Sequence, residues 1–406
     1  MSVTGIISEY NPFHNGHKYN CNMAKKITGS DCIISVMSGN FLQRGEPALF
    51  DKWLRSKMAI LEGVDLVIEL PVIYSCQPAE NFAYGAVKIL NSLGIVDYLC
   101  FGSESGDIDE LMKVTNILIN EPEYFRNHVQ KNILEGITYS KAIGDAINSI
   151  TDAKIAQPNN ILGLEYLKAI RKLKSNIEPV TIKRINNEYH DTCLTGAISG
   201  ATAIREEIKL NGLSDKLSKA VPKSTFDIMT QSYKYQGSPI FIEDFSDLIF
   251  YQLRKSSLRD LAVLPHIKEG LENRIKAKSN TSTTLNDLID CVKTKRYTRT
   301  YLQRILCYTL LGMTKDDVLH SKSSKSIVYI RVLALNKKGR VLLKKIKANS
   351  SYPIINKAAD FKSKDKFLNR MFELDVLATD IYNLVKKNPE CKLQKQDYLK
   401  SPNYMD

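Results

Sequence analysis

The chain has 406 residues, 43% of them hydrophobic and 25% charged, which is ordinary for a soluble protein of two or three domains. No apolar run is long enough to span a bilayer, and the first 20 residues lack the cationic start of a secretory signal. The eight cysteines form no CxxC pair and no zinc-type cluster, so we expect reduced thiols and a cytoplasmic protein. The net charge of +13 favours a polyanionic partner.

The first half of the chain alternates strand and helix patterns. We predict strands at residues 3–7, 32–37, 65–69, 95–101 and 180–185, and helices at 15–27, 51–62, 79–93, 161–173 and 202–210, with residues 107–175 largely helical. Such alternation is typical of βαβ units. It predicts an α/β fold with a Rossmann-like parallel sheet.

Helical periodicity dominates after residue 210, and residues 328–335 read either as a strand or as a buried helical turn. The charge also changes there. Residues 1–210 carry 21 Lys and Arg against 24 Asp and Glu, whereas residues 211–406 carry 36 against 20. We therefore predict a nucleotidyltransferase-like catalytic domain at 1–210 and a mainly α-helical, basic domain at 211–406. The alternative is a generic basic surface without a dedicated partner.

The sequence His14-Asn15-Gly16-His17 stands where the first strand gives way to a helix. A glycine there lets backbone N–H groups approach a phosphate, and the helix N-terminus adds its positive end. Two imidazoles can donate to the charge that builds up when an α-phosphate is attacked. The motif therefore predicts a nucleoside triphosphate site, the alternative being a pair of helix-capping or core histidines.

Longer strings narrow this reading. They are Glu9-Tyr10-Asn11-Pro12-Phe13 before the motif, Met37-Ser38-Gly39-Asn40-Phe41, Gln43-Arg44-Gly45-Glu46-Pro47-Ala48, Phe101-Gly102-Ser103-Glu104, Pro158-Asn159-Asn160 and Lys293-Thr294-Lys295-Arg296-Tyr297-Thr298. With them the whole chain resembles the bacterial tRNA(Met) cytidine acetate ligases, a family within the HxGH nucleotidyltransferase superfamily.

The resemblance implies an enzyme that forms acetyl-adenylate from acetate and ATP. The acetyl group then passes to N4 of the wobble cytidine (position 34) of elongator tRNA(Met), giving N4-acetylcytidine. Mg²⁺ is expected only as the usual companion of ATP, and we predict no metal site on the protein. Acetate is expected near His14 and residues 38–47.

Site residues also follow from the resemblance. It implies catalytic roles for His14, His17, Thr202 and Arg205. It implies ATP contacts from Ile7, Ser8, Glu9, Tyr10, Asn11, Pro12, Phe13, His14, Asn15, Gly16, His17, Gly102, Asn159 and Arg184. Taken alone, Asn159 reads equally as a helix N-cap and Arg184 as a solvated charge.

Two positions depart from the superfamily pattern. In the second phosphate site, at residues 198–205, Gly200 and Ala201 replace hydroxyl side chains, so donors there must be backbone N–H groups. Asn20 stands where close relatives are expected to carry a further histidine.

In the basic half, cations alternate with aromatic residues, a pattern suited to phosphates and unpaired bases. The predicted tRNA-binding residues are Lys293, Lys295, Arg296, Tyr297, Arg299 and Arg304, the alternative being a solvated helix face. Arg331, Lys337, Lys338 and Arg340 form a second candidate patch. The segment Lys322-Ser323-Ser324-Lys325-Ser326 resembles the KMSKS loop of class I synthetases, but we expect a linker or a tRNA-backbone contact there.

Two other functions stay open at this point. One is an adenylyl- or cytidylyltransferase acting on a small metabolite phosphate, which seldom needs a basic domain of this size. The other is a non-catalytic RNA-binding protein with a relic site, which the intact His14, Gly16, His17 and Thr202 disfavour.

Overall fold

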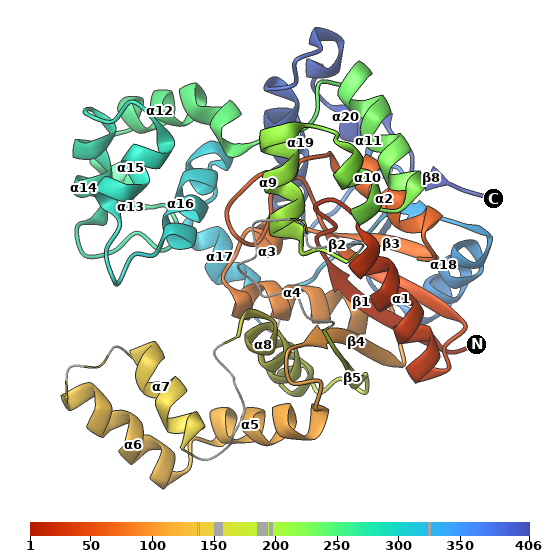
Figure 1. Ribbon diagram of the computed structural model, residues 1–406, viewed down its shortest axis with the longest axis horizontal. Coiled ribbons are helices and arrows are strands. Elements are labelled where there is room, and N and C mark those ends of the chain that lie inside the picture. Colours follow the sequence, from red (N-terminus) through yellow and green to blue (C-terminus); the bar gives the residue numbers. More distant parts are fainter. Residues whose placement is uncertain (136, 138, 150–156, 185–193, 195–197, 324–325) are drawn as a thin grey trace.

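The computed structural model describes residues 1–406 except 136, 138, 150–156, 185–193, 195–197 and 324–325. Its centre is an eight-stranded sheet in the order β5-β4-β1-β2-β3-β6-β7, with β8 paired to β6 (Figure 1). The strands are β1 (Val3–Ser8), β2 (Cys32–Ser38), β3 (Leu66–Leu70), β4 (Tyr98–Ser103), β5 (Glu178–Lys183), β6 (Ile330–Leu335), β7 (Ile354–Ile355) and β8 (Asn403–Tyr404). Strands β1 to β5 pair in parallel, which confirms the predicted sheet.

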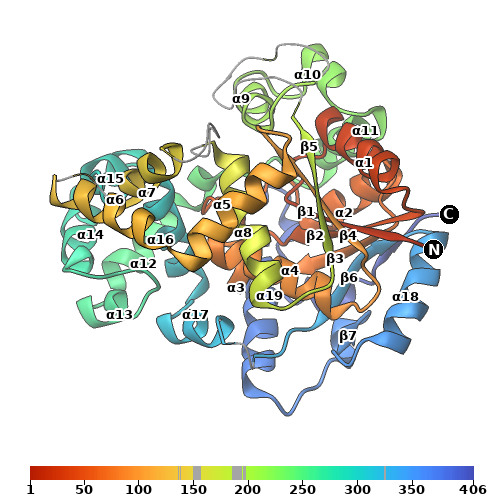
Figure 2. The ribbon, with the colours of Figure 1, turned by 90° about the horizontal axis from the view of Figure 1, so that it is seen from below.

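Helices cover both faces of the parallel strands, and β2 is accordingly buried along its whole length. On one face Ile34 and Val36 belong to the same apolar cluster as residues of α4 (Ala79–Ser92) and α8 (Pro158–Lys172). On the other face Ile33 and Met37 belong to a second apolar cluster, which includes residues of α1 (Asn15–Thr28) and α2 (Lys52–Leu61). Figure 2 shows the strands between α1 on one side and α4 and α8 on the other.

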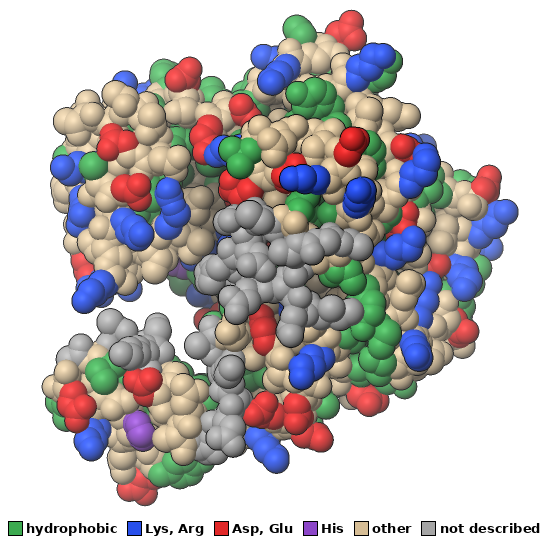
Figure 3. All heavy atoms as spheres, in the orientation of Figure 1, with side chains coloured by type: hydrophobic (Ala, Val, Ile, Leu, Met, Phe, Trp, Pro, Cys, Tyr) green, Lys and Arg blue, Asp and Glu red, His purple; other side chains and the backbone are tan. Residues whose placement is uncertain are grey.

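The other helices form two lobes and the flanks of the sheet (Figure 1). One lobe holds α5 (Ile108–Asn120), α6 (Glu123–Leu134) and α7 (Tyr139–Asn148), and the other holds α12 (Ser246–Lys255), α13 (Leu258–Ala262), α14 (Leu271–Ser279), α15 (Leu285–Val292) and α16 (Arg299–Leu311). The flanks comprise α3 (Val72–Ser75), α9 (Ala201–Asn211), α10 (Asp215–Ala220), α11 (Lys223–Tyr235), α17 (Lys315–Ser321), α18 (Lys337–Asn349), α19 (Lys366–Leu384) and α20 (Gln396–Leu399). An open gap separates the two lobes in Figure 3. Among the described residues, no helix combines the length and hydrophobicity required to cross a membrane.

The C-terminal part of the chain returns to the sheet. Residues 330–335, whose conformation the sequence left open, form the fully buried strand β6, which lies antiparallel to β3. Strand β8 then pairs with β6. Strands from both sides of residue 211 form this sheet, and the division of the chain into two domains at that position stays a prediction.

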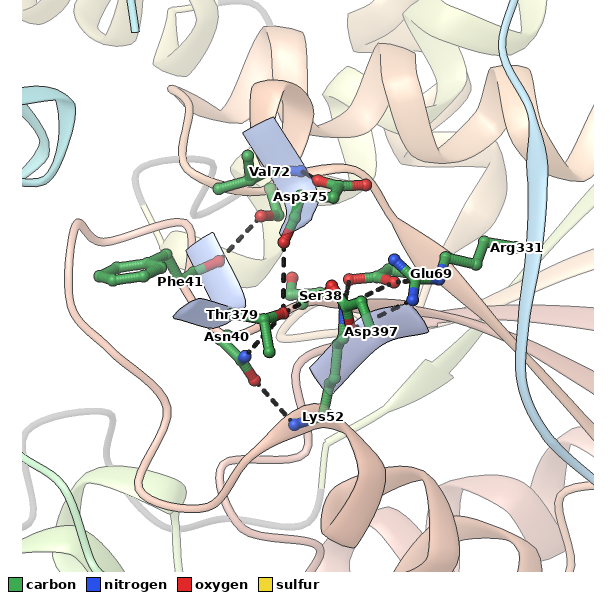
Figure 4. A network of polar contacts seen from close by, with 12 residues as sticks. Ser38, Asn40, Phe41, Lys52, Glu69, Val72, Arg331, Asp375, Thr379 and Asp397 are labelled. Carbon is green, nitrogen blue, oxygen red and sulfur yellow. Dashed lines mark hydrogen bonds and ion pairs between the residues drawn. The ribbon is translucent and has the colours of Figure 1, made fainter. Parts of the chain in front are cut away.

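A buried ion cluster joins β6 to the rest of the sheet (Figure 4). Lys52 Nζ lies 2.8 Å from Glu69 Oε1 and 3.0 Å from Asp397 Oδ1. Arg331 reaches the same two carboxylates at 3.3 and 3.1 Å, and all four side chains are at most 2% exposed. Arg331 therefore cannot belong to a surface patch, which corrects the expectation from sequence. Its charge is balanced by partners far away in the chain.

Asp375 borders this cluster and gives the first testable prediction. Its carboxylate accepts from Val72 N at 2.7 Å and from the Tyr329 hydroxyl, while burial and the nearby Glu69 raise its pKa to about 7. The folded state therefore holds a proton that the unfolded chain has released. We expect wild-type stability to fall, relative to Asp375→Asn, as the pH rises from about 4 to about 7, by about 1.4 kcal/mol for each pH step of one within that interval.

In Asp375→Asn, Oδ1 can still accept from Val72 N, while Nδ2 can donate to the Tyr329 hydroxyl oxygen, so the variant keeps a partner for each group but does not ionise. Urea unfolding of both proteins at pH 4, 5.5 and 7 measures the difference. A difference that does not change with pH would contradict the assignment.

Candidate nucleotide site

A cavity of about 310 Å³ opens at the carboxyl ends of β1 and β4. The chain runs from β1 outward to β2 and β3 on one side and to β4 and β5 on the other, so this crevice is the switch point of the sheet. Open α/β sheets bind nucleotides at this position. The lining includes these predicted residues: Ile7, Ser8, Glu9, Tyr10, Asn11, His14, Gly16, His17, Gly102, Asn159, Arg184, Thr202 and Arg205.

Three of the predicted contacts lie outside the lining. Phe13 is fully buried and packs against the rings of Tyr10 and His17. Asn15 donates from Nδ2 to the carbonyl of Lys219 at 2.9 Å. Pro12 lies in the turn that leads to the motif. These residues shape the turn, and the structure does not bring their side chains to the cavity.

The two histidines cap the start of α1, and their rings stack on each other. His14 Nδ1 accepts from Gly16 N at 3.1 Å, and His17 Nδ1 accepts from His14 N at 3.2 Å, which makes a reciprocal cap with the rings stacked 3.7 Å apart. A Cβ on Gly16 would lie 2.9 Å from His14 Cε1, so the cap requires glycine. Because both Nδ1 atoms accept, each neutral ring carries its proton on Nε2.

The histidines are neutral at physiological pH. Burial, together with the charges of Arg184 and Arg205, lowers the pKa of His14 to about 3. Burial, His14 and Arg184 also lower the pKa of His17 well below its usual value. The pair therefore offers two Nε2–H donors, while the positive charge of the site comes from the arginines.

Helix α9 forms the opposite wall. It begins at Ala201 after Gly200, and Arg205 Nη2 lies 3.4 Å from Thr202 Oγ1 and 3.7 Å from Glu46. The backbone N–H groups of its first turn supply the donors that Gly200 and Ala201 cannot supply from side chains. Asn20 also lines the cavity, and its Oδ1 has no hydrogen-bond partner within the part of the chain that the structure describes.

Comparison with known proteins agrees with this geometry. A sequence model described as HIGH Nucleotidyl Transferase matches residues 1–397. The tRNA(Met) cytidine acetate ligase of Acetivibrio thermocellus is 44% identical over 408 residues, covering 98% of each chain. That of Alkaliphilus metalliredigens is 42% identical, covering 100% of this chain and 99% of its own. The chain belongs to the tRNA(Met) cytidine acetate ligase family.

Solved structures of the family share the fold over the whole chain. TmcAL from Thermotoga maritima, in its apo form, is 32% identical with a TM-score of 0.93, and the match covers 100% of both chains. The same Thermotoga protein bound with alpha-thio ATP matches with a TM-score of 0.91. The predicted family, the α/β nucleotidyltransferase fold and the helical additions are thereby confirmed.

Residues 38–47 form a second wall whose detail the sequence did not predict. Gln43, Arg44 and Glu46 line the cavity, and Gln43 N donates to Glu9 Oε1 at 2.8 Å. Burial raises the pKa of Glu9. Gly45, with φ of +76°, packs on the backbone of α16, where a Cβ would lie 2.2 Å from Arg304 N. Only glycine allows this contact.

Arg55 on α2 connects this wall to the turn at residues 9–14, called the His turn below. Its fully buried guanidinium donates to the carbonyls of Phe50 at 2.8 Å, Glu9 at 2.5 Å and Ser38 at 3.1 Å, and also to that of Gly39. In the sequence Arg55 looks like one more charge on an amphipathic helix. Its function as a clamp depends on carbonyls that only the fold brings together.

The predicted tRNA-binding residues divide into two environments. Lys293, Lys295 and Arg296 are exposed beside the start of α16, with Arg296 paired to Glu269. Arg299 donates to Asn286 Oδ1 at 2.8 Å and Tyr297 packs on Tyr301. By contrast, Arg304 is only 9% exposed and donates to the Gln43 carbonyl at 3.2 Å, so it faces the cavity wall.

The remaining candidates lie elsewhere. Lys338 Nζ donates to the Asp31 carbonyl at 3.1 Å, which places the exposed Lys337, Lys338 and Arg340 at the amino ends of the strands, opposite the cavity. In the segment 322–326, Ser324 and Lys325 lie outside the described residues. Ser326 Oγ accepts from Lys88 Nζ at 2.7 Å, which docks the end of this segment on α4.

Proposed function

We propose that this chain is an ATP-dependent acetate ligase. It forms acetyl-adenylate and then acetylates N4 of cytidine 34 of elongator tRNA(Met). Family membership over the whole chain carries the proposal, together with the paired neutral histidines at the switch point of the sheet. A cytoplasmic location, where ATP and tRNA are available, accords with this activity.

The first step needs no protein nucleophile. An acetate oxygen attacks the α-phosphorus of ATP, the bond to the β-phosphate breaks, and pyrophosphate leaves with its electron pair. Catalysis then consists of positioning and charge stabilisation. Nε2–H of His14 and His17 would donate to the α-phosphate oxygens, while Thr202, Arg205 and the first turn of α9 would hold the leaving phosphates.

Residues near the His turn would also form the acetate subsite. Gln43, Arg44 and Glu46 line the cavity on the side of Glu9. An arginine there suits a carboxylate. We assign acetate to this wall, in keeping with the expectation that it binds near His14 and residues 38–47.

ATP normally carries Mg²⁺. Among the described residues, no three or more His, Cys, Asp and Glu side chains are grouped to hold a metal ion. Our proposal is that Mg²⁺ enters the site with the phosphates of the substrate.

The second step transfers the acetyl group. The N4 amine attacks the acetyl carbonyl, the bond from carbon to the phosphate oxygen breaks, AMP leaves and N4 loses one proton. This amine is weakly nucleophilic because it is conjugated with the ring, so an activated acyl donor is needed. A wobble base in an anticodon loop is already accessible, which lowers the cost of presenting it.

The distribution of charge favours the α12–α16 lobe as the tRNA-binding surface. The α12–α16 lobe, residues 246–311, carries 12 Lys and Arg against 6 Asp and Glu, whereas residues 107–148 carry 4 against 7. Because α16 also supports the wall at Gln43 and Gly45, a tRNA held beside Arg299 would lie close to the cavity.

The activity is tested in two assays. Acetate-dependent exchange of pyrophosphate into ATP reports the first step, and transfer of labelled acetate to elongator tRNA(Met) reports the second. A transcript with uridine at position 34 is the matched control for the second assay. Exchange that needs a metabolite phosphate instead of acetate would favour the nucleotidyltransferase alternative, and absence of any exchange would favour the relic site.

A charge-reversed variant tests whether this lobe binds tRNA. We expect the triple variant Lys295→Glu, Arg296→Glu, Arg299→Glu to lose acetyl transfer to tRNA while pyrophosphate exchange persists. A plot of the logarithm of the tRNA association constant against the logarithm of the salt concentration has a negative slope, and each lost phosphate contact should make that slope shallower by about 0.7–0.9. An unchanged slope would make these residues a solvated face, and loss of exchange would mean that the two steps are not separable in this way.

A further inference from the structure

Glu104, directly after β4, occupies the N-terminus of α8. Its Oε1 accepts from Asn159 Nδ2 at 2.6 Å and from Asn159 N at 3.3 Å, and its Oε2 accepts from Asn160 N at 2.8 Å. In return, Asn160 Oδ1 accepts from Glu104 N at 3.0 Å. One carboxylate therefore satisfies the first N–H groups of a 15-residue helix and joins that helix to the end of β4.

This contact also orients two residues of the cavity. Because Nδ2 of Asn159 donates to Glu104, its Oδ1 is turned to Arg184, whose Nη1 lies 3.1 Å away. The Arg184 side chain passes over Gly102, where a Cβ would lie 3.3 Å from Arg184 Cγ. Asn159, Arg184 and Gly102 line the cavity, whereas Glu104 does not. Glu104 thus acts on the site only through its neighbours.

The carboxylate also decides which helix ends can receive phosphate. Helices α1, α8 and α9 start at the cavity, and residues of the first turn of each line it. At the start of α8, the charge of Glu104 already satisfies the N–H groups and repels a second anion.

We propose that Glu104 is a positioning residue for the nucleoside end of ATP. It fixes the Asn159–Arg184 pair against the nucleoside and closes the N-terminus of α8 to phosphate, so the triphosphate lies across α1 and α9. This inference rests on the proposed use of ATP.

The test compares three ligands on four proteins. Binding of ATP, adenosine and inorganic tripolyphosphate is measured by calorimetry on the wild type, Glu104→Ala, Glu104→Gln and the control Glu165→Gln. Glu165 is another carboxylate on α8, paired with Lys168 at 2.9 Å and absent from the cavity lining. Thermal midpoints are recorded for all four proteins.

We expect Glu104→Ala to weaken the binding of adenosine about tenfold or more, since the hydrogen bonds that the carboxylate makes to Asn159 and Asn160 are lost. Tripolyphosphate should bind as in the wild type or more tightly, because a further helix N-terminus becomes available. Glu104→Gln keeps the shape but replaces one acceptor oxygen with an NH₂ group, so it should shift adenosine in the same direction. Glu165→Gln should bind all three ligands normally.

Two results would overturn the proposal. In one, the affinities for adenosine and tripolyphosphate fall by the same factor, which is the result expected if Glu104 only caps the helix. In the other, adenosine is unaffected. If Glu104→Ala does not fold, the isosteric Glu104→Gln decides by the same criterion. Failure of the wild type to bind ATP at all would instead refute the proposed function, so the two failures can be told apart.

Discussion

Replacing Asp397 with alanine is expected to lower the free energy of unfolding by about 3–5 kcal/mol. The change leaves Lys52 and Arg331 buried with only Glu69 to balance two cations. Breaking a buried ion cluster by removing one member is costly because the remaining charge is not solvated. Urea unfolding at pH 7 measures the loss.

The exposed Glu373 on α19 provides the matched control, because its truncation removes a carboxylate without uncovering a buried charge. Asp397→Asn should resemble the alanine variant, since it keeps the shape of the side chain but removes the charge. A loss below about 1 kcal/mol, the scale of a surface pair, would contradict the electrostatic account.

Removing either imidazole is expected to slow acetyl-adenylate formation about 10²–10³-fold, the effect of losing one transition-state donor. His14→Ala also removes the helix cap, which costs about 1 kcal/mol of stability. His14→Asn separates the two effects, because asparagine is a good N-cap but has no ring donor. Acetate-dependent pyrophosphate exchange and thermal midpoints together distinguish them.

We expect His14→Asn to restore the thermal midpoint but not the rate. Because the pKa values of both rings are lowered, neither histidine should gain a proton between pH 7 and pH 6. The wild-type exchange rate should therefore not fall over this range through protonation of His14 or His17. Near-normal exchange in His14→Asn or His17→Ala would refute the site.

Local pattern was enough to predict the parallel core. The predicted strand at residues 32–37 and the helix at 15–27 correspond to β2 (Cys32–Ser38) and α1 (Asn15–Thr28). The apolar run at 328–335 could not be assigned, because a segment buried on every side has no period. Arg331 within it looked like a surface charge, since its partners Glu69 and Asp397 lie 262 and 66 positions away in the sequence.

The residues of the site could be predicted where they belong to one continuous motif or to a string that resembles the family. The sequence placed His14 and His17 at a strand-to-helix turn, and the structure adds that His14 N donates to His17 Nδ1 and Gly16 N donates to His14 Nδ1. The roles of Arg55 and Glu104 depend on backbone groups contributed by other segments. No spacing in the sequence indicates such partners.

Strand β3 remains an edge strand during synthesis until β6 has been made. The segment Leu66–Leu70 is buried throughout, and Leu70 and Leu335 are 265 positions apart. At about 5–20 residues per second this interval lasts on the order of 10–50 s. During that time the nascent chain carries an unpaired apolar strand that can template intermolecular pairing. A fragment that ends before β6, such as the predicted domain 1–210, keeps this edge open, and we expect it to be prone to aggregation.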